Sequence, residues 1–146
     1  MVHDTKRYVA IMKEFYGAFE KPVGAERAAA LHARYFDESE RIHVPGQGVK
    51  DFKYHHETEY EVFGAFPDLT LHIDDIFGAD DQVVVRFTLT GTHTGPLYSL
   101  PPTGRKVVMT GIGIYRFAPH GRIVEEWYEN DGIGQMRQLG LLPENP

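Results

Sequence analysis

The segment QVVVRFTLTGT, residues 82–92, carries the clearest structural pattern in the chain. Its apolar side chains Val83, Val85, Phe87 and Leu89 recur at every second position, which is the period of a strand with one buried face. The β-branched and aromatic residues that fill the segment are enriched in strands. We therefore predict a long strand here, with one face against a core.

Further strands are predicted on both sides of this segment. Residues 69–73 alternate apolar and polar side chains before it, and residues 107–117 and 122–129 are β-rich runs after it. Turn-forming residues at 78–81 and 120–121 separate these runs. Because such short turns connect neighbouring strands, the second half of the chain is predicted to be an antiparallel meander.

The first half of the chain has helical spacing instead. Apolar residues recur at helical intervals over residues 4–20 and 25–36, and again from residue 49 to a break at residue 67. A short strand is predicted at 41–44 and a short final helix at about 133–139. Helices followed by an antiparallel sheet form an α+β fold, in which the N-terminal helices cover the apolar face of the sheet. A strongly curled sheet would enclose a cavity on that face.

The composition fits one globular domain spanning residues 1–146. At this length roughly two thirds of the unfolded surface is buried on folding, and 42% of the residues are hydrophobic. The absence of cysteine excludes disulfides, thiolate metal sites and thiol nucleophiles, and it favours the cytoplasm. The 18 aromatic residues, nine Phe, eight Tyr and one Trp, suit a dense core or a pocket for a flat organic ligand.

Several partner classes are excluded. The net charge is -6 and the basic residues are scattered, whereas nucleic-acid binding normally shows a basic face. Uninterrupted apolar stretches are only a few residues long, far short of the roughly 20 that a membrane-spanning helix needs. The N-terminal sequence lacks the features of a signal peptide, so secretion is not expected.

Five motifs follow one another in an order that resembles the SnoaL-like polyketide cyclases, a group of the nuclear transport factor 2-like superfamily. They are Ala65-Phe66-Pro67-Asp68-Leu69, Gly91-Thr92-His93-Thr94-Gly95, Pro101-Pro102-Thr103-Gly104, Arg122-Ile123-Val124-Glu125-Glu126-Trp127 followed by Asp131, and Gln138-Leu139-Gly140. The similarity extends from about residue 8 to residue 141. It implies a cone-shaped α+β fold with one buried pocket.

The resemblance also implies a chemistry. Characterised members close a ring of an aromatic polyketide ester by an intramolecular aldol step, using an aspartate as acid and base without metal or cofactor. By resemblance that aspartate is Asp131, and His93 matches a pocket histidine. The implied ligand is a small hydrophobic or aromatic molecule, and no cofactor is expected. A fold alone does not establish a function.

Strand periodicity gives an independent interpretation of the last strand. Ile123, Trp127 and Asp131 share one parity, so without a bulge they point to the same side, which the apolar residues indicate is the pocket. A buried aspartate there would have a raised pKa and would be a better base. The alternative is that Asp131 only caps the final helix.

Other candidate pocket residues come from the strands and helices. His93 continues the inward parity of residues 83–89 and could donate a hydrogen bond to an enolate oxygen, or it could be a turn histidine satisfied by the backbone. The remaining expected ligand contacts are Tyr16, His43, Phe52, His56 and Phe63. The sequence His56-Glu57-Thr58-Glu59-Tyr60 approaches a zinc motif, but Tyr60 replaces its second histidine, so no metal site is predicted.

Two other functions stay open beside a cyclase or isomerase: a binding domain without chemistry, and an epoxide hydrolase with an Asp-Arg-Asp pocket. A homodimer is also predicted. The outer face of the sheet would carry Val84, Val108, Ile112 and Tyr128, which is more apolar than exposure to solvent favours. Members of the superfamily commonly pair through this face.

Overall fold

The computed structural model describes residues 2–144, within which ten helices and strands follow one another. In chain order they are α1 (Thr5–Gly17), α2 (Ala25–Tyr35), β1 (Phe36–Val44), β2 (Gly48–Lys50), α3 (Phe52–Ala65), β3 (Thr70–Ala79), β4 (Gln82–Thr92), β5 (Lys106–Phe117), β6 (Ile123–Asn130) and α4 (Gly132–Gln138). The outermost ends of the predicted domain, residues 1 and 145–146, lie outside the described residues. No helix within residues 2–144 is long and apolar enough to cross a membrane.

The strands form one six-stranded sheet in the order β2-β1-β6-β5-β4-β3. Each strand from β3 to β6 pairs antiparallel with the next, which confirms the predicted meander. β1 differs from the prediction, because it runs parallel to β6 and makes the sheet mixed. The chain leaves α2 at the end of the sheet where β6 begins, since Phe36 pairs with Ile123, and both strands then run in the same direction.

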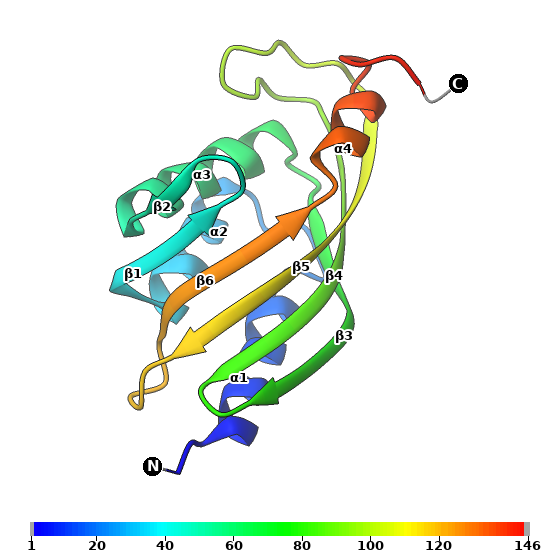
Figure 1. Ribbon diagram of the computed structural model, residues 1–146. Coiled ribbons are helices and arrows are strands. Elements are labelled where there is room, and N and C mark those ends of the chain that lie inside the picture. The colour runs from blue at the N-terminus through cyan, green and yellow to red at the C-terminus, as the bar shows by residue number, and fades with distance from the viewer. Residues whose placement is uncertain (1, 145–146) are drawn as a thin grey trace.

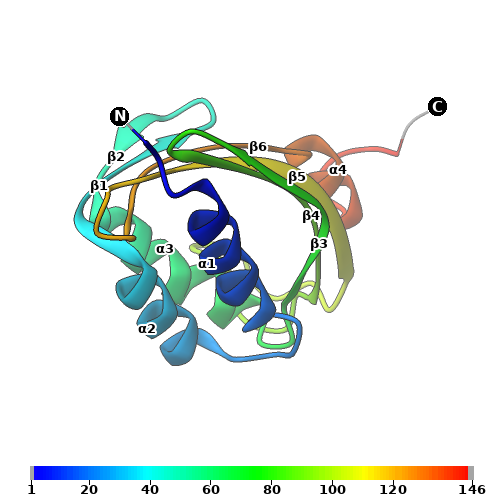
Figure 2. The same cartoon turned by 90° about the horizontal axis from the view of Figure 1, so that it is seen from below.

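The sheet curls around the N-terminal helices (Figure 1). Viewed from below, the strands form an open arc with α1 inside it and with α2 and α3 beside α1 (Figure 2). The sheet does not close on itself, because β2 and β3 remain at its two edges. This arrangement confirms the predicted α+β fold with a curled sheet covered by helices.

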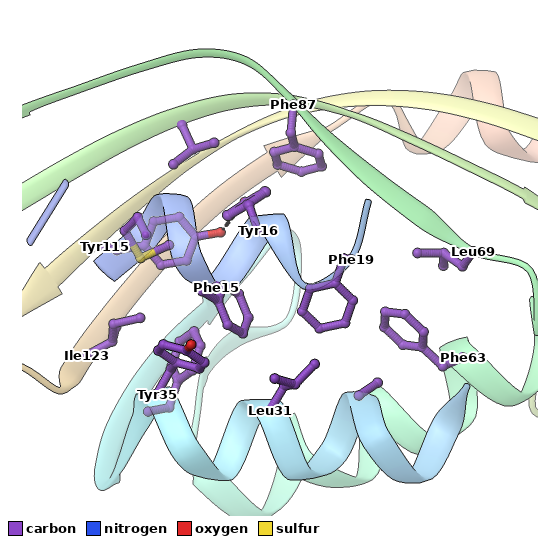
Figure 3. Packing of buried hydrophobic residues seen from close by; sticks show 14 of the residues in the cluster. Phe15, Tyr16, Phe19, Leu31, Tyr35, Phe63, Leu69, Phe87, Tyr115 and Ile123 are labelled. Carbon is purple, nitrogen blue, oxygen red and sulfur yellow. Dashed lines mark hydrogen bonds between the residues drawn. The ribbon is translucent and has the colours of Figure 1, made fainter. Parts of the chain in front are cut away.

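The core forms between α1 and the concave face of the sheet. The buried stripe of α1 includes Tyr8, whose ring stacks on Phe117 of β5 at 4.7 Å between centroids. Phe15 and Phe19 lie between the sheet and α2 (Figure 3). Burying each such aromatic side chain stabilises the fold by roughly 1.5–3 kcal/mol relative to leaving it exposed.

The segment before α3 differs from the predicted helix. Val49 belongs to β2 and pairs with His43 of β1, so α3 begins at Phe52. The helix starts there because the Asp51 carboxylate accepts a hydrogen bond from the backbone N–H of Tyr54, at 3.0 Å. This start determines which residues of α3 face the sheet.

A β-bulge at Val124 sets the orientation of β6. Phe117 of β5 pairs with Ile123, but the adjacent Arg116 pairs with Glu125, so β6 has one extra residue over this interval. An extra residue turns every following side chain to the opposite face. Ile123 faces the core, and beyond the bulge Glu126 faces the helices.

Candidate functional site

A cavity of about 260 Å³ lies between the concave face of the sheet and helices α1 and α3. Most of its wall is apolar, and the rings of Phe15, Phe19, Phe36, Phe63 and Phe87 contribute to it. Phe19 and Phe63 pack against each other, with 5.3 Å between ring centroids (Figure 3). Such a wall suits a flat and largely apolar ligand.

A carboxyl group, that of Glu126, interrupts this apolar wall. Glu126 lies on β6 between Tyr115 of β5 and Ile42 of β1, and only 7% of the residue is exposed. The pKa of Glu126 is raised to about 8, chiefly by burial; the positive charge of His55 opposes this rise, and the neighbouring carboxylates Glu40 and Glu59 add to it. At neutral pH the group is therefore mostly a neutral carboxylic acid.

His55 lies on α3 between two carboxylates. Its Nδ1 is 3.1 Å and 3.2 Å from the two carboxylate oxygens of Glu40, and its Nε2 is 3.2 Å from Oε1 of Glu59. Burial alone would lower the pKa of His55, but the hydrogen bonds to Glu40 and Glu59 outweigh it and raise this pKa well above 6.5. His55 and Glu59 both line the cavity, whereas the Glu40 side chain is fully buried behind them.

His32 of α2 completes this cluster. Its Nε2 is hydrogen-bonded to Oε1 of Glu40, and its ring lies 4.0 Å from the ring of His55. The His32, Glu40 and His55 ligand atoms lie within 4.8 Å of one another, a spacing that could in principle hold a metal ion. Each nitrogen already has the Glu40 carboxylate as its hydrogen-bond partner, so we interpret the cluster as a hydrogen-bonded network.

Two tyrosines add hydroxyl groups to the cavity wall. The hydroxyls of Tyr16 and Tyr115 are hydrogen-bonded to each other, as the dashed line in Figure 3 marks. Burial raises the pKa of both phenols, so both stay protonated in the physiological range. One of the two hydroxyl protons is donated within the pair, which leaves the other free for an oxygen of a ligand.

The structure brings some of the predicted ligand contacts to this cavity and leaves others outside it. Tyr16 and Phe63 line the cavity. Phe52 and His56 do not line it: their rings stack on each other at 5.9 Å, and Phe52 packs against His32 at 4.6 Å. The expected stripe was extrapolated from Val49, which lies outside the helix; the residues of α3 that face the cavity follow His55, Glu59 and Phe63 instead.

His93 is fully buried but lies outside the cavity wall. Its Nδ1 accepts a hydrogen bond from the backbone N–H of Thr103 at 3.2 Å, and its ring stacks on Phe66. Its backbone bonds to both Gly104 and Arg105, so the residue fastens the base of the loop between β4 and β5. His93 does not contact the cavity, and its catalytic role stays a prediction.

Trp127 and His43 lie on the outer face of the sheet. Their rings stack at 4.8 Å, and His43 Nε2 is 2.7 Å from the carboxylate of Glu125. The expected position of Trp127 on the cavity wall is wrong, because the bulge at Val124 reverses the parity on which it depended. Both residues instead border a shallow depression on the outer face.

Asp131 caps the last helix. Its carboxylate accepts a hydrogen bond from the backbone N–H of Gly134 at 2.9 Å, and the residue is exposed. The contact that the capping alternative requires is therefore present, and the acid-base role that the resemblance implies stays a prediction. The adjacent Asn130 does reach the cavity wall.

Sequence reasoning missed the polar residues that the structure gathers at the cavity. His55, Glu59 and Phe63 recur at intervals of four along α3. This spacing could have been recognised from the sequence if the helix had been predicted to begin at Phe52. Glu126 could not be found by parity, because the bulge leaves no distinct pattern in the sequence. Glu40 comes from a distant segment and meets His55 only through the fold.

Comparisons with known proteins agree with this architecture. The family model of SnoaL-like polyketide cyclases matches residues 10–139. Among curated proteins, no relative matches the chain with significance.

Solved structures share the fold over nearly the whole chain. AclR from Streptomyces galilaeus, proposed to be a hydroxylase, is 23% identical with a TM-score of 0.84, and the match covers 98% of this chain and 87% of AclR. A protein from Jannaschia sp. CCS1, proposed to be a SnoaL-like polyketide cyclase, is 20% identical with a TM-score of 0.79 and 95% coverage of both chains. IdmH from Streptomyces antibioticus, proposed to be a polyketide cyclase, is 27% identical with a TM-score of 0.73, covering 94% of this chain and 99% of IdmH. With a family model that spans most of its length and a fold shared with these structures, the chain belongs to the SnoaL-like polyketide cyclase family.

Proposed function

We propose that this protein catalyses cofactor-independent acid-base chemistry, an aldol cyclisation or an isomerisation, on a small hydrophobic ring compound that carries a carbonyl group. The observation that carries the proposal is Glu126, a nearly buried carboxyl group on the cavity wall whose pKa is raised to about 8. A group with a pKa near the working pH is suited to exchange protons with a substrate. Two carboxyl groups in contrasting environments are a recurrent arrangement for acid and base.

The two cavity carboxyl groups would have different roles. Glu59, ion-paired with His55, is the base that takes the proton from the carbon next to the substrate carbonyl. Glu126 is the acid that gives its proton to the carbonyl oxygen, so that a neutral enol forms instead of an enolate. The positive charge of His55 stabilises the Glu126 carboxylate that this transfer leaves behind.

The aldol step restores both groups. The enol carbon attacks a second carbonyl carbon of the same molecule, and the new carbon–carbon bond closes the ring. The enol hydroxyl proton returns to Glu126, and the proton on Glu59 passes to the oxygen of the attacked carbonyl. The reaction is therefore an isomerisation of the substrate with no net consumption of protons.

The cavity limits the ligand in size and polarity. Its volume of about 260 Å³ lies slightly below the roughly 300–1,000 Å³ of typical ligand pockets, so a small ring compound fits better than a large one. None of the described residues that line it is an arginine or an aspartate, and an epoxide hydrolase with an Asp-Arg-Asp pocket is therefore not supported.

Proton exchange gives a test that does not require the natural substrate. The wild-type protein should accelerate the exchange of α-protons of small cyclic aromatic ketones in D₂O, followed by ¹H NMR. Glu126→Gln preserves the shape but cannot donate the acid proton, so exchange should fall by about a hundredfold or more. Asp131→Asn tests the role that the resemblance implies: because Asn also caps helices, this variant should exchange at the wild-type rate if Glu126 is the acid.

Each other result points to a different conclusion. Loss of exchange in Asp131→Asn but not in Glu126→Gln would assign the chemistry to Asp131. Saturable ketone binding with no exchange by the wild-type protein would favour a binding domain.

We also propose that the protein is a homodimer that pairs through the outer face of the sheet. A row of side chains crosses five strands on this face, as the register pairs Phe77 with Val84, Val84 with Ile114, Ile114 with Trp127, and Trp127 with His43. Val108 and Ile112 are both 48% exposed there. Tyr128, expected on this face, borders the depression there and also reaches the cavity.

A further inference from the structure

Four side chains form one chain of polar contacts, two hydrogen bonds and an ion pair, that runs from the interior to the cavity. His32 of α2 contacts Glu40 of β1, Glu40 contacts His55 of α3, and His55 contacts Glu59 one helical turn further along. Only the last two residues line the cavity. The side chains of His32 and Glu40 are 1% and 0% exposed, so no ligand in the cavity could touch them.

The geometry at His55 requires a proton on both ring nitrogens. A carboxylate only accepts hydrogen bonds, and His55 has one carboxylate at Nδ1 and another at Nε2. The hydrogen bond at Nδ1 and the ion pair at Nε2 are both attractive only if both nitrogens carry protons, which is the imidazolium form. The buried Glu40 carboxylate in turn is stabilised by this charge, since an unpaired buried carboxylate would be strongly unfavourable.

His32 contributes a donor without a second charge. Its Nε2 bonds to Glu40, while its Nδ1 is buried without a partner. Burial lowers the pKa of His32 despite the bond to Glu40, so the ring is neutral and donates through Nε2–H. The rings of Phe36 and Phe52 pack against His32 at 5.0 Å and 4.6 Å and fix its orientation.

We propose that Glu40 and His32 are positioning residues that hold His55 as an oriented imidazolium at the cavity wall. The inference rests on the proposed function, because this imidazolium is the charge that stabilises Glu126 after proton transfer. The titratable groups that act on His55 are Glu40 from β1, Glu59 from its own helix and Glu126 from β6, with the neutral His32 from α2 packed on its ring. Among them, Glu40 is the carboxylate that never meets the ligand.

Replacing Glu40 should change the charge of His55 without altering the cavity wall. In Glu40→Gln, His55 keeps only Glu59 as an anionic partner, so its imidazolium should be lost at a lower pH than in the wild type. Glu126 then loses both the positive charge of His55, which lowers its pKa, and the Glu40 carboxylate, which raises it. The His55 charge is the larger of the two effects, so the falling limb of the exchange rate should move to higher pH. His32→Gln keeps a donor for Glu40 and should retain the charge of His55.

The experiment is an NMR titration of ¹⁵N-labelled histidine in four proteins: wild type, Glu40→Gln, His32→Gln and the control His56→Gln, whose ring has no contact with Glu40. We expect wild-type His55 to carry protons on both nitrogens at pH 8, with His32→Gln and His56→Gln like the wild type. Glu40→Gln should lower the titration midpoint of His55 by one pH unit or more. The ketone exchange rate of Glu40→Gln should fall at least tenfold in kcat with little change in KM.

A neutral His55 in the wild-type protein at pH 8 would overturn the inference, and this measurement needs no variant to fold. An unchanged His55 midpoint in a folded Glu40→Gln protein would also overturn it. Because the titration requires no substrate, a protein without ketone exchange but with the expected His55 shifts would reject the proposed function and leave the control of His55 by Glu40 established.

Discussion

The stability of the Glu126→Gln variant should increase relative to that of the wild type as the pH rises from 5 to 7. In the folded wild type the pKa of Glu126 is about 8, against an ordinary value of 4.5 for the unfolded chain. Between these values the unfolded state releases the proton and the folded state retains it, so wild-type stability falls with rising pH. Gln has no proton to release, and this dependence disappears in the variant.

The size of this change in stability follows from the difference between the pKa values of Glu126 in the folded and unfolded states. Each pH unit within the window is worth about 1.4 kcal/mol, and the unfolded group is already largely ionised at pH 5. From pH 5 to pH 7 the free energy of unfolding of Glu126→Gln should therefore rise by about 2–3 kcal/mol relative to the wild type. Costs of the substitution that do not depend on pH cancel in this comparison.

Urea unfolding at the two pH values measures this difference, with the fluorescence of Trp127, the only tryptophan, as the signal. Glu129→Gln is the control, because Glu129 lies on the same strand but is exposed and outside the cavity wall. A stability difference for Glu126→Gln that is equal at pH 5 and pH 7 would show that Glu126 ionises normally in the folded protein, and the reasoning would fail.

Two further substitutions test the last helix and the outer face of the sheet. Asp131→Ala should lose about 1 kcal/mol of stability in urea unfolding and Asp131→Asn only a few tenths, because the carboxylate caps α4 and Asn can replace it; equal losses would contradict the capping role. Ile112→Lys should convert a dimer to a monomer in sedimentation experiments and shift the emission of the nearby Trp127, whereas the similarly exposed Tyr60→Lys on α3 should stay dimeric. A wild-type protein that sediments near 16.6 kDa would contradict the dimer.

Periodicity predicted the sheet well where the strand pairing is regular. Residues 82–92 form β4 as expected, with Val83, Val85 and Phe87 buried, because β4 pairs continuously with β5 over its full length. The first helix was also predictable, since its buried residues follow one stripe. In both cases the local sequence pattern agrees with the packing that the fold imposes.

The same logic failed on β6 for a specific physical reason. Ile123 and Val124 are consecutive apolar residues, so the sequence does not indicate where the alternation of faces is interrupted. The bulge at Val124 places Glu126 on the cavity wall and Trp127 on the outer face. Helix α3 shows a related limit: the helix begins after the Asp51 cap, so Val49 is no guide to its buried face, and His55 lines the cavity where His56 was expected.

The buried network lies beyond any local pattern. His32, Glu40 and His55 come from a helix, a strand and a second helix, and only the packing of α2 and α3 on β1 brings them together. Their protonation states depend on burial and on one another, so spacing alone could not reveal them.

The most direct test of the account is the ionisation of Glu126 itself. The carboxyl carbon of Glu126 can be followed by ¹³C NMR in protein labelled at glutamate, with Glu126→Gln used to assign the signal. The account predicts a protonated carboxyl at pH 7 that titrates with a midpoint near 8. A signal that titrates near the ordinary value of 4.5 would contradict the proposed acid and the chemistry that depends on it.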